Sequence, residues 1–210
     1  MSVNSMNYLA HLYLAQPDQG FSLLGNLMGD FCKGVVLTQL PVPIQRGIKN
    51  HRAVDQITDN HPIIRDLKRL FEQRFRRFAG IITDVAFDYF LIKHWSVFSQ
   101  IPLTNFIEHA YVELWAHRQW MPVQMQGIVG RMIEQNWLQS YQSLDGVGFA
   151  LARMSKRIRF ENPLAETKGQ LIKNYDELEQ GFLHFFPLLI KEINELAIES
   201  LEIPITSKVN

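Results

Sequence analysis

Residues 79–95 read AGIITDVAFDYFLIKHW, and this stretch decides the fold. Its apolar side chains lie on nearly every side of the helix that their spacing predicts, as Ile82, Val85 and Phe87 illustrate. A helix that is apolar nearly all round has to be buried among other elements. The stretch therefore predicts a central helix that the rest of the chain surrounds.

The remainder of the sequence shows the same helical period and almost no strand-like alternation. Turn and capping residues such as Gly34 and Pro62 divide it into segments. The predicted helices cover residues 6–15, 22–33, 43–58, a segment that begins at 62, 79–95, 104–120, 122–141, 143–157 and 163–201. We predict an all-α protein of about eight or nine helices. They form a single domain over residues 1–202, and a loose tail follows at 203–210.

The composition is that of a globular protein. Of its 210 residues, 47% are hydrophobic and 20% are charged, which excludes a disordered chain. The 21 basic and 21 acidic residues cancel, so the total charge predicts neither a nucleic-acid partner nor a membrane surface. No apolar run approaches the roughly 18 residues of a membrane span. Cys32 is the single cysteine and the first residues lack signal-peptide features, so we expect a cytoplasmic protein. The oligomeric state is not indicated.

Two acids interrupt the apolar helix at 79–95. Asp84 and Asp88 are four residues apart and therefore share a helix face. An ionised carboxylate in an apolar interior is costly unless it is paired, hydrogen-bonded or bound to a metal. Two acids one turn apart also repel each other, and a divalent cation relieves that repulsion. The pair therefore points to a metal site.

Further candidate ligands lie on neighbouring helices. His51 and Asp55 share a face, and Asp30 sits inside an apolar segment. With Asp84 they form a mixed nitrogen and oxygen set, which suits Mn²⁺, Mg²⁺ or Fe²⁺ better than structural zinc. Asp88 is then a further ligand or the base that orients water. The alternatives are a surface hydrogen bond for the His51–Asp55 pair and helix capping for Asp30.

Basic residues are unevenly distributed along the chain. One cluster lies in residues 65–77, and a second comprises Arg153, Lys156, Arg157 and Arg159. Either these residues form part of a solvated surface of mixed charge or they form a docking face for an acidic partner.

Several of these residues also carry a family resemblance. The matching pieces are Met6-Asn7-Tyr8-Leu9-Ala10-His11-Leu12, Gly25-Asn26 with Asp30-Phe31, Gly47-Ile48…His51-Arg52…Asp55…Thr58-Asp59…Pro62, Asp84-Val85…Asp88…Phe90-Leu91…His94-Trp95, Arg153-Met154-Ser155-Lys156-Arg157 and Tyr175…Leu178-Glu179. In this order they resemble the acyl carrier protein phosphodiesterase family. One departure is Tyr89, where the family more usually has His.

The resemblance implies a fold and an activity. The family is similar to the HD-type metal phosphohydrolases, which are all-helical and hold a divalent metal, typically Mn²⁺, on His and Asp side chains. The implied reaction is the hydrolysis of holo-acyl carrier protein to the apo protein and 4′-phosphopantetheine, within lipid metabolism. Because acyl carrier proteins are acidic, the resemblance favours docking on the basic residues.

For this reaction we assign hypothetical roles to individual residues. His11 or His61 would supply the proton for the departing serine oxygen, and Arg52 would contact the phosphate. Arg153, Lys156, Arg157 and Arg159 would contact the carrier protein. Two other functions remain open, namely an HD-like hydrolase of a nucleotide or other small phosphodiester, and a helical protein that binds an acidic partner without catalysis.

Overall fold

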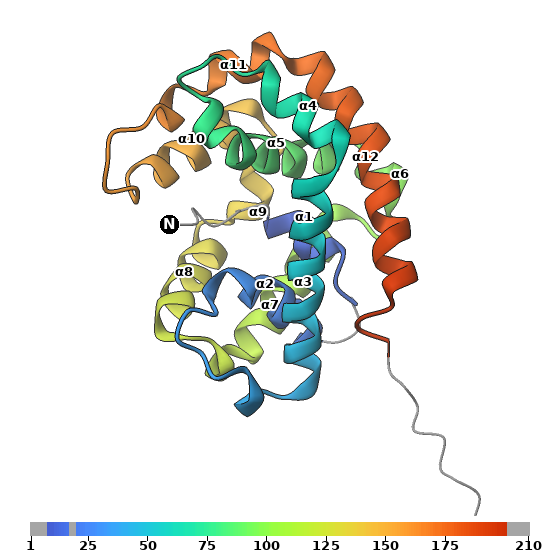
Figure 1. Cartoon of the computed structure of the whole chain (residues 1–210). Helices are drawn as coiled ribbons and strands as arrows, with labels where there is room; N and C mark the ends of the chain where they lie inside the picture. Colours follow the sequence, from blue (N-terminus) through green and yellow to red (C-terminus); the bar gives the residue numbers. More distant parts are fainter. Residues whose placement is uncertain (1–7, 17–19, 201–210) are drawn as a thin grey trace, which may run out of the picture.

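The computed structural model describes residues 8–16 and 20–200, and within them the protein is helical throughout, with no strand (Figure 1). The α-helices are α1 (Tyr8–Tyr13), α2 (Gly20–Met28), α3 (Val42–Asn60), α4 (Pro62–Leu70), α5 (Ala79–Lys93), α6 (Trp95–Phe98), α7 (Leu103–Ala116), α8 (Val123–Glu134), α9 (Trp137–Ser140), α10 (Leu144–Ser155), α11 (Lys168–Lys173) and α12 (Tyr175–Leu196). Five short 3-10 helices join them: η1 (Gly29–Phe31), η2 (Leu37–Gln39), η3 (Arg76–Phe78), η4 (Arg118–Trp120) and η5 (Leu164–Glu166).

The prediction of an all-α protein is confirmed, but the predicted number of helices is wrong. The described residues contain twelve α-helices rather than eight or nine, because three predicted helices are interrupted. Residues 122–141 divide into α8 and α9 at Asn136, whose left-handed backbone (φ 46°) cannot continue a helix. Helix α5 ends at Lys93 and α6 begins at Trp95, and residues 163–201 divide into η5, α11 and α12 without a left-handed residue at either break. The predicted tail, with its boundary at 202, lies outside the described residues.

Helix α5 is central, as predicted. It contacts α1, α4, α10 and α12, and its apolar side chains, among them Ile82, Val85 and Leu91, are fully buried. Phe87 packs edge-on against Phe182 of α12, and Phe90 stacks on the same ring. Contact on every side explains why the sequence of this helix shows no polar face.

The long helix α3 links two groups of helices (Figure 1). In that view α2, α7 and α8 lie in the lower part of the molecule, and α4, α5, α10 and α11 lie in the upper part. Helix α12 begins in the upper part and runs down the right side. Helix α1 lies between the two groups, next to α2 and α5, and His11 on α1 reaches α3. In the described part of the chain, no helix is both long and apolar enough to cross a membrane.

A close crossing of α2 and α3 brings the polar residues of both helices together. A Cβ atom on Gly25 would lie 2.5 Å from the carbonyl oxygen of Ile44 and 2.9 Å from the Cα of Gly47. Only glycine permits backbones to approach this closely. The crossing therefore sets the distance from α2 and the following η1 to His51 on α3.

Candidate metal centre

Three side chains from two helices converge between the upper and lower parts of the molecule. They are His11 of α1 and His51 and Asp55 of α3, and their ligand atoms all lie within 4.8 Å of one another. Both imidazoles are buried, and the carboxylate of Asp55 is about one-third exposed. Two imidazoles and a carboxylate are donors that divalent metals accept, so the three residues form a possible metal-binding triad.

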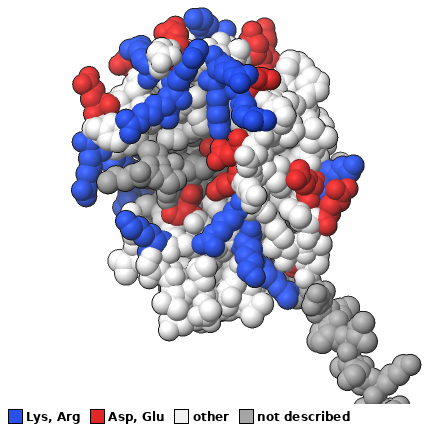
Figure 2. Space-filling model, in the orientation of Figure 1, with Lys and Arg blue, Asp and Glu red and all other residues white. Residues whose placement is uncertain are grey.

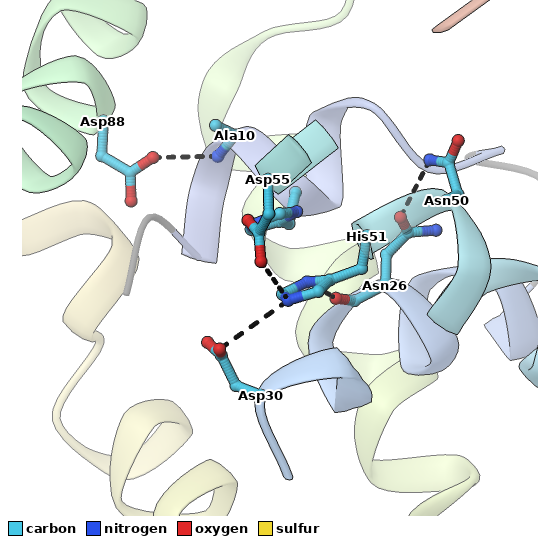
Figure 3. Close-up of polar contacts among 8 residues, drawn as sticks. Ala10, Asn26, Asp30, Asn50, His51, Asp55 and Asp88 are labelled. Carbon is cyan, nitrogen blue, oxygen red and sulfur yellow. Dashed lines mark hydrogen bonds and ion pairs between the residues drawn. The ribbon is translucent and has the colours of Figure 1, made fainter. Parts of the chain in front are cut away.

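The ring of His51 is fixed by a hydrogen bond behind it. Its Nδ1–H donates to the backbone carbonyl of Asn26 at 2.7 Å, because a carbonyl oxygen can only accept. Its Nε2 therefore lies 3.2 Å from Asp55 Oδ2 and 3.7 Å from Asp30 Oδ1, with the two carboxylates on one side of the ring (Figure 3). Metal-binding histidines usually have this arrangement, with one nitrogen held by a carbonyl group and the other facing the metal.

His11 completes the group without a satisfied hydrogen bond of its own. Its ring stacks on that of His51 with the centroids 3.9 Å apart, and its Nε2 lies 3.2 Å from Asp55 Oδ1. Within the described residues, neither ring nitrogen has a partner in hydrogen-bond geometry, although the side chain is 1% exposed. Such orphaned nitrogens are costly in a buried site. A cation shared with Asp55 and His51 would satisfy Nε2, so the donor set fits a divalent metal.

The packing around His51 leaves no room for a larger neighbour. A Cβ atom on Gly29, at the start of η1, would lie 2.1 Å from His51 Cδ2. Glycine at this position therefore lets the η1 backbone pass directly over the imidazole, and Asp30 follows it in the sequence.

Electrostatics distinguish the two histidines. Burial lowers the pKa of His11, and the neighbouring His51 lowers it further. Burial also acts to lower the pKa of His51, but the carboxylates of Asp30 and Asp55 outweigh this effect and raise it to about 9. Burial acts to raise the pKa of Asp55, yet His11 and His51 bring it well below its ordinary value. Without a metal, the proton on His51 is thus the positive charge that the acids surround.

This arrangement predicts a pH-dependent stability for the metal-free protein. The folded pKa of His51 lies above its ordinary value, so its contribution is complete below about pH 6.5 and is lost as the pH rises through about 9. His11, whose folded pKa is lowered, opposes the trend only near pH 6.5, because above about pH 7.5 it is neutral in both the folded and the unfolded state. We expect the free energy of unfolding in urea to fall between about pH 7.5 and 9. The slope should be shallower in His51→Gln, and an equal slope in both proteins would contradict the assignment.

The structure brings His11, His51, Asp55 and Asp30 together. Asp84 is buried on α5 and is not one of the three described residues whose ligand atoms group together. Its role as a metal ligand stays a prediction.

His61 lies at the opposite end of α3 from the α2–α3 crossing. It is ten residues from His51, a distance of about 15 Å along a helix. Its Nδ1 accepts a hydrogen bond from the Ile63 amide, so it caps α4. This contact gives His61 a structural role at the start of α4, and its role as a proton donor stays a prediction.

Asp88 is held by backbone amides. It is fully buried on α5, and one of its oxygens accepts a hydrogen bond from the Leu9 amide at 3.1 Å. The other oxygen accepts one from the Ala10 amide at 2.9 Å (Figure 3). These amides belong to the first turn of α1, where they have no partner inside the helix. Burial raises the pKa of Asp88, and the two amides oppose that rise. The contacts position α1, and with it His11.

Removal of this anchor should cost stability. In Asp88→Ala, two buried amides lose their acceptor, and each unsatisfied group costs about 1–3 kcal/mol. We expect the free energy of unfolding in urea to fall by about 2–6 kcal/mol. Asp88→Asn retains one acceptor oxygen and should lose less. Unchanged stability in Asp88→Ala would show that α1 does not depend on this carboxylate.

The basic residues singled out in the sequence lie near the centre on two sides. Arg157 lines one pocket with Tyr8 of α1. Burial raises the pKa of Tyr8, the nearby Asp30 adds to that rise, and the Arg157 guanidinium opposes it. Arg52 on α3 lies close enough to Cys32 to oppose the rise in the pKa of that thiol caused by burial. In Figure 2, Lys and Arg side chains lie above and below a recessed area that contains carboxylates.

The second basic cluster is organised around an aromatic side chain. The guanidinium groups of Arg153 and Arg157 lie 4.3 and 5.7 Å from the ring centroid of Trp137, and Lys156 and Arg159 are exposed beside them. Among the described residues, these four cations and Arg52 form no ion pair with an acid. Arg69 and Arg74 of the first cluster, by contrast, are paired with Asp66 and Glu166.

Sequence reasoning did not identify two features of this centre. It read His11 as a proton donor, although the ring lies among the candidate ligands. It also gave Asn26 no role, although its carbonyl orients His51. A buried asparagine in an apolar helix was the available signal, but a backbone carbonyl group has no sequence signature.

Comparisons with known proteins agree over nearly the whole chain. The family model described as acyl carrier protein phosphodiesterase matches residues 6–189. A protein of that name from Serratia proteamaculans (strain 568) is 35% identical over 191 residues, which are 90% of this chain and 98% of the relative. Another from Salmonella newport (strain SL254) is 34% identical over 194 residues, or 92% and 100% of the two chains. No solved structure matches, so the HD-like description of the fold stays a prediction. The chain belongs to the acyl carrier protein phosphodiesterase family.

Proposed function

We propose that the protein is a metal-dependent phosphodiesterase that hydrolyses holo-acyl carrier protein to apo-acyl carrier protein and 4′-phosphopantetheine. The names of its relatives support the reaction and the substrate. The observation that carries the metal dependence is the buried convergence of His11, His51 and Asp55. The cytoplasmic location expected from the sequence is kept as part of the proposal.

The residues of the centre would hold a divalent cation, for which we propose Mn²⁺. His11, His51 and Asp55 supply two nitrogens and a carboxylate, and Asp30 lies next to them with a second carboxylate. When bound, such an ion lowers the pKa of a bound water and neutralises charge on the phosphoryl oxygens. Mixed imidazole and carboxylate ligands suit Mn²⁺ and Fe²⁺, and a Mg²⁺ site would use oxygen ligands alone.

The protein residues have distinct roles around that ion. Asn26 keeps the His51 ring in one tautomer, and Asp55 reaches both imidazoles through its two oxygens. Asp30 extends the negative charge on the side of Tyr8 and Arg157, where it would complete the ligand set or orient water. We assign His11 to the ligand set rather than to proton donation, because both of its nitrogens are buried inside the centre.

The substrate would dock on the unpaired cations around the centre. Arg153, Lys156, Arg157 and Arg159 lie on and after α10, and Arg52 lies on α3 on the other side. Among residues 8–16 and 20–200 these cations form no ion pair with an acid, which suits them to an acidic partner because no such pair must be broken on binding. Arg52 would then contact the phosphate group, and the α10 residues would contact the carrier protein.

The direct test is the intact mass of holo-acyl carrier protein after incubation with the enzyme, with Mn²⁺ and with a chelator. Loss of the whole phosphopantetheine arm only when Mn²⁺ is present supports reaction, substrate and metal dependence together. Loss of the arm that persists in chelator would overturn the metal proposal alone. An unchanged mass together with turnover of a small phosphodiester would overturn the substrate proposal.

A further inference from the structure

A chain of buried hydrogen bonds leads from the end of the described structure to the metal centre. Glu199, three residues beyond α12, is 9% exposed. Its Oε1 accepts a hydrogen bond from Asn26 Nδ2 at 2.7 Å, and its Oε2 accepts one from the Ser22 hydroxyl. Both partners lie on α2, so the carboxylate is attached to the helix whose carbonyl holds His51.

Asn26 is the residue through which these contacts converge. It is fully buried, and its Nδ2 also donates to the carbonyl oxygen of Ser22 at 3.1 Å. Its Oδ1 accepts a hydrogen bond from Asn50 Nδ2 at 2.9 Å, and its backbone carbonyl accepts the Nδ1–H of His51 at 2.7 Å (Figure 3). Every polar group of the side chain is thus satisfied, which leaves Asn26 one orientation relative to α3.

Burying the carboxylate of Glu199 costs free energy, which its hydrogen bonds must offset. Within the described part of the chain, Glu199 forms no ion pair, and burial raises its pKa while its two hydrogen bonds oppose that rise. Charge-assisted hydrogen bonds are roughly twice as strong as neutral ones. What the charge stabilises is therefore the position of Ser22 and Asn26 on α2, and the group that depends on this position is His51.

We propose that Glu199 is a positioning residue for the metal centre. It holds Asn26 so that the Asn26 carbonyl keeps His51 Nδ1 protonated and directs Nε2 toward Asp30 and Asp55. Glu199 lies beyond residues 6–189, the part of the chain that matches the family model. The inference rests on the metal site of the proposed function, since it concerns the ligand geometry of that site.

The test compares Mn²⁺ affinity with stability. In Glu199→Ala we expect the dissociation constant of Mn²⁺, measured by calorimetry on the metal-free protein, to rise about 10–100-fold, as for other groups that orient a metal-binding histidine. Glu199→Gln keeps the volume and one acceptor oxygen for Asn26 but cannot accept the Ser22 hydroxyl. It should therefore lie between the wild type and Glu199→Ala. The kcat for holo-acyl carrier protein should fall while KM stays the same, because the docking cations are untouched.

Ile193→Ala is the matched control. Ile193 is buried near the end of α12, so its truncation lowers the free energy of unfolding without touching the hydrogen-bond chain. Its Mn²⁺ affinity should equal that of the wild type. Wild-type affinity in Glu199→Ala, or an equal loss in Ile193→Ala, would overturn the positioning role. No binding of Mn²⁺ to the wild type would instead overturn the metal site itself, and the inference with it.

Discussion

His51→Ala should lower kcat/KM for holo-acyl carrier protein by more than about 100-fold. Loss of a group that only hydrogen-bonds to a metal-binding histidine already lowers metal affinity or activity by about 10–100-fold. The substitution removes the nitrogen that faces Asp55 and Asp30, and it also removes the ring on which His11 stacks. The expected signature is loss of Mn²⁺ binding in calorimetry together with loss of turnover by intact mass. Asp55→Asn should behave alike, since Asp55 contacts both imidazoles.

A histidine outside the centre serves as the control. His184 is exposed on α12, so His184→Ala should retain wild-type turnover and Mn²⁺ affinity. Circular dichroism should show the same helical content in both variants, because α3 needs no ion to form its backbone hydrogen bonds. A folded His51→Ala protein with full Mn²⁺-dependent activity would exclude this centre as the active site.

Charge reversal at Lys156 and Arg157 should weaken the use of the carrier protein by about 10–100-fold in kcat/KM at low salt. The basis is that oppositely charged surfaces raise the association rate by factors of this size and more. The effect should appear mainly in KM and should shrink as salt is added, because screening acts on exposed charges. Steady-state kinetics of the double variant Lys156→Glu/Arg157→Glu at two ionic strengths would measure both.

The matched control changes the net charge equally at cations that already have acidic partners. Lys173 pairs with Glu72 and Lys191 with Glu195, so the double variant Lys173→Glu/Lys191→Glu should change KM little. If both double variants lose activity equally, the effect is that of total charge and the docking face is not at α10. If neither loses activity, docking does not depend on these cations.

Local sequence patterns determined much of this protein. The helical period specifies the all-α fold, and the apolar circumference of residues 79–95 specifies a central α5, because each depends on spacing within one element. The pairing of His51 with Asp55 is also local, since side chains four apart on a helix meet. The short breaks, such as that at Asn136, depend on one backbone conformation and were not predicted.

Only the tertiary structure decided what surrounds that pair. A buried acid in α5 was correctly expected to need a partner. The partners of Asp88 are backbone amides 78 and 79 residues away, and the sequence does not show where a backbone amide will lie. His11 reaches Asp55 from another helix, and Asn26 reaches His51 because two glycines let α2 and α3 touch. Glu199 meets Asn26 across 173 residues. Such contacts follow from how helices pack, which the periodicity of any single helix does not specify.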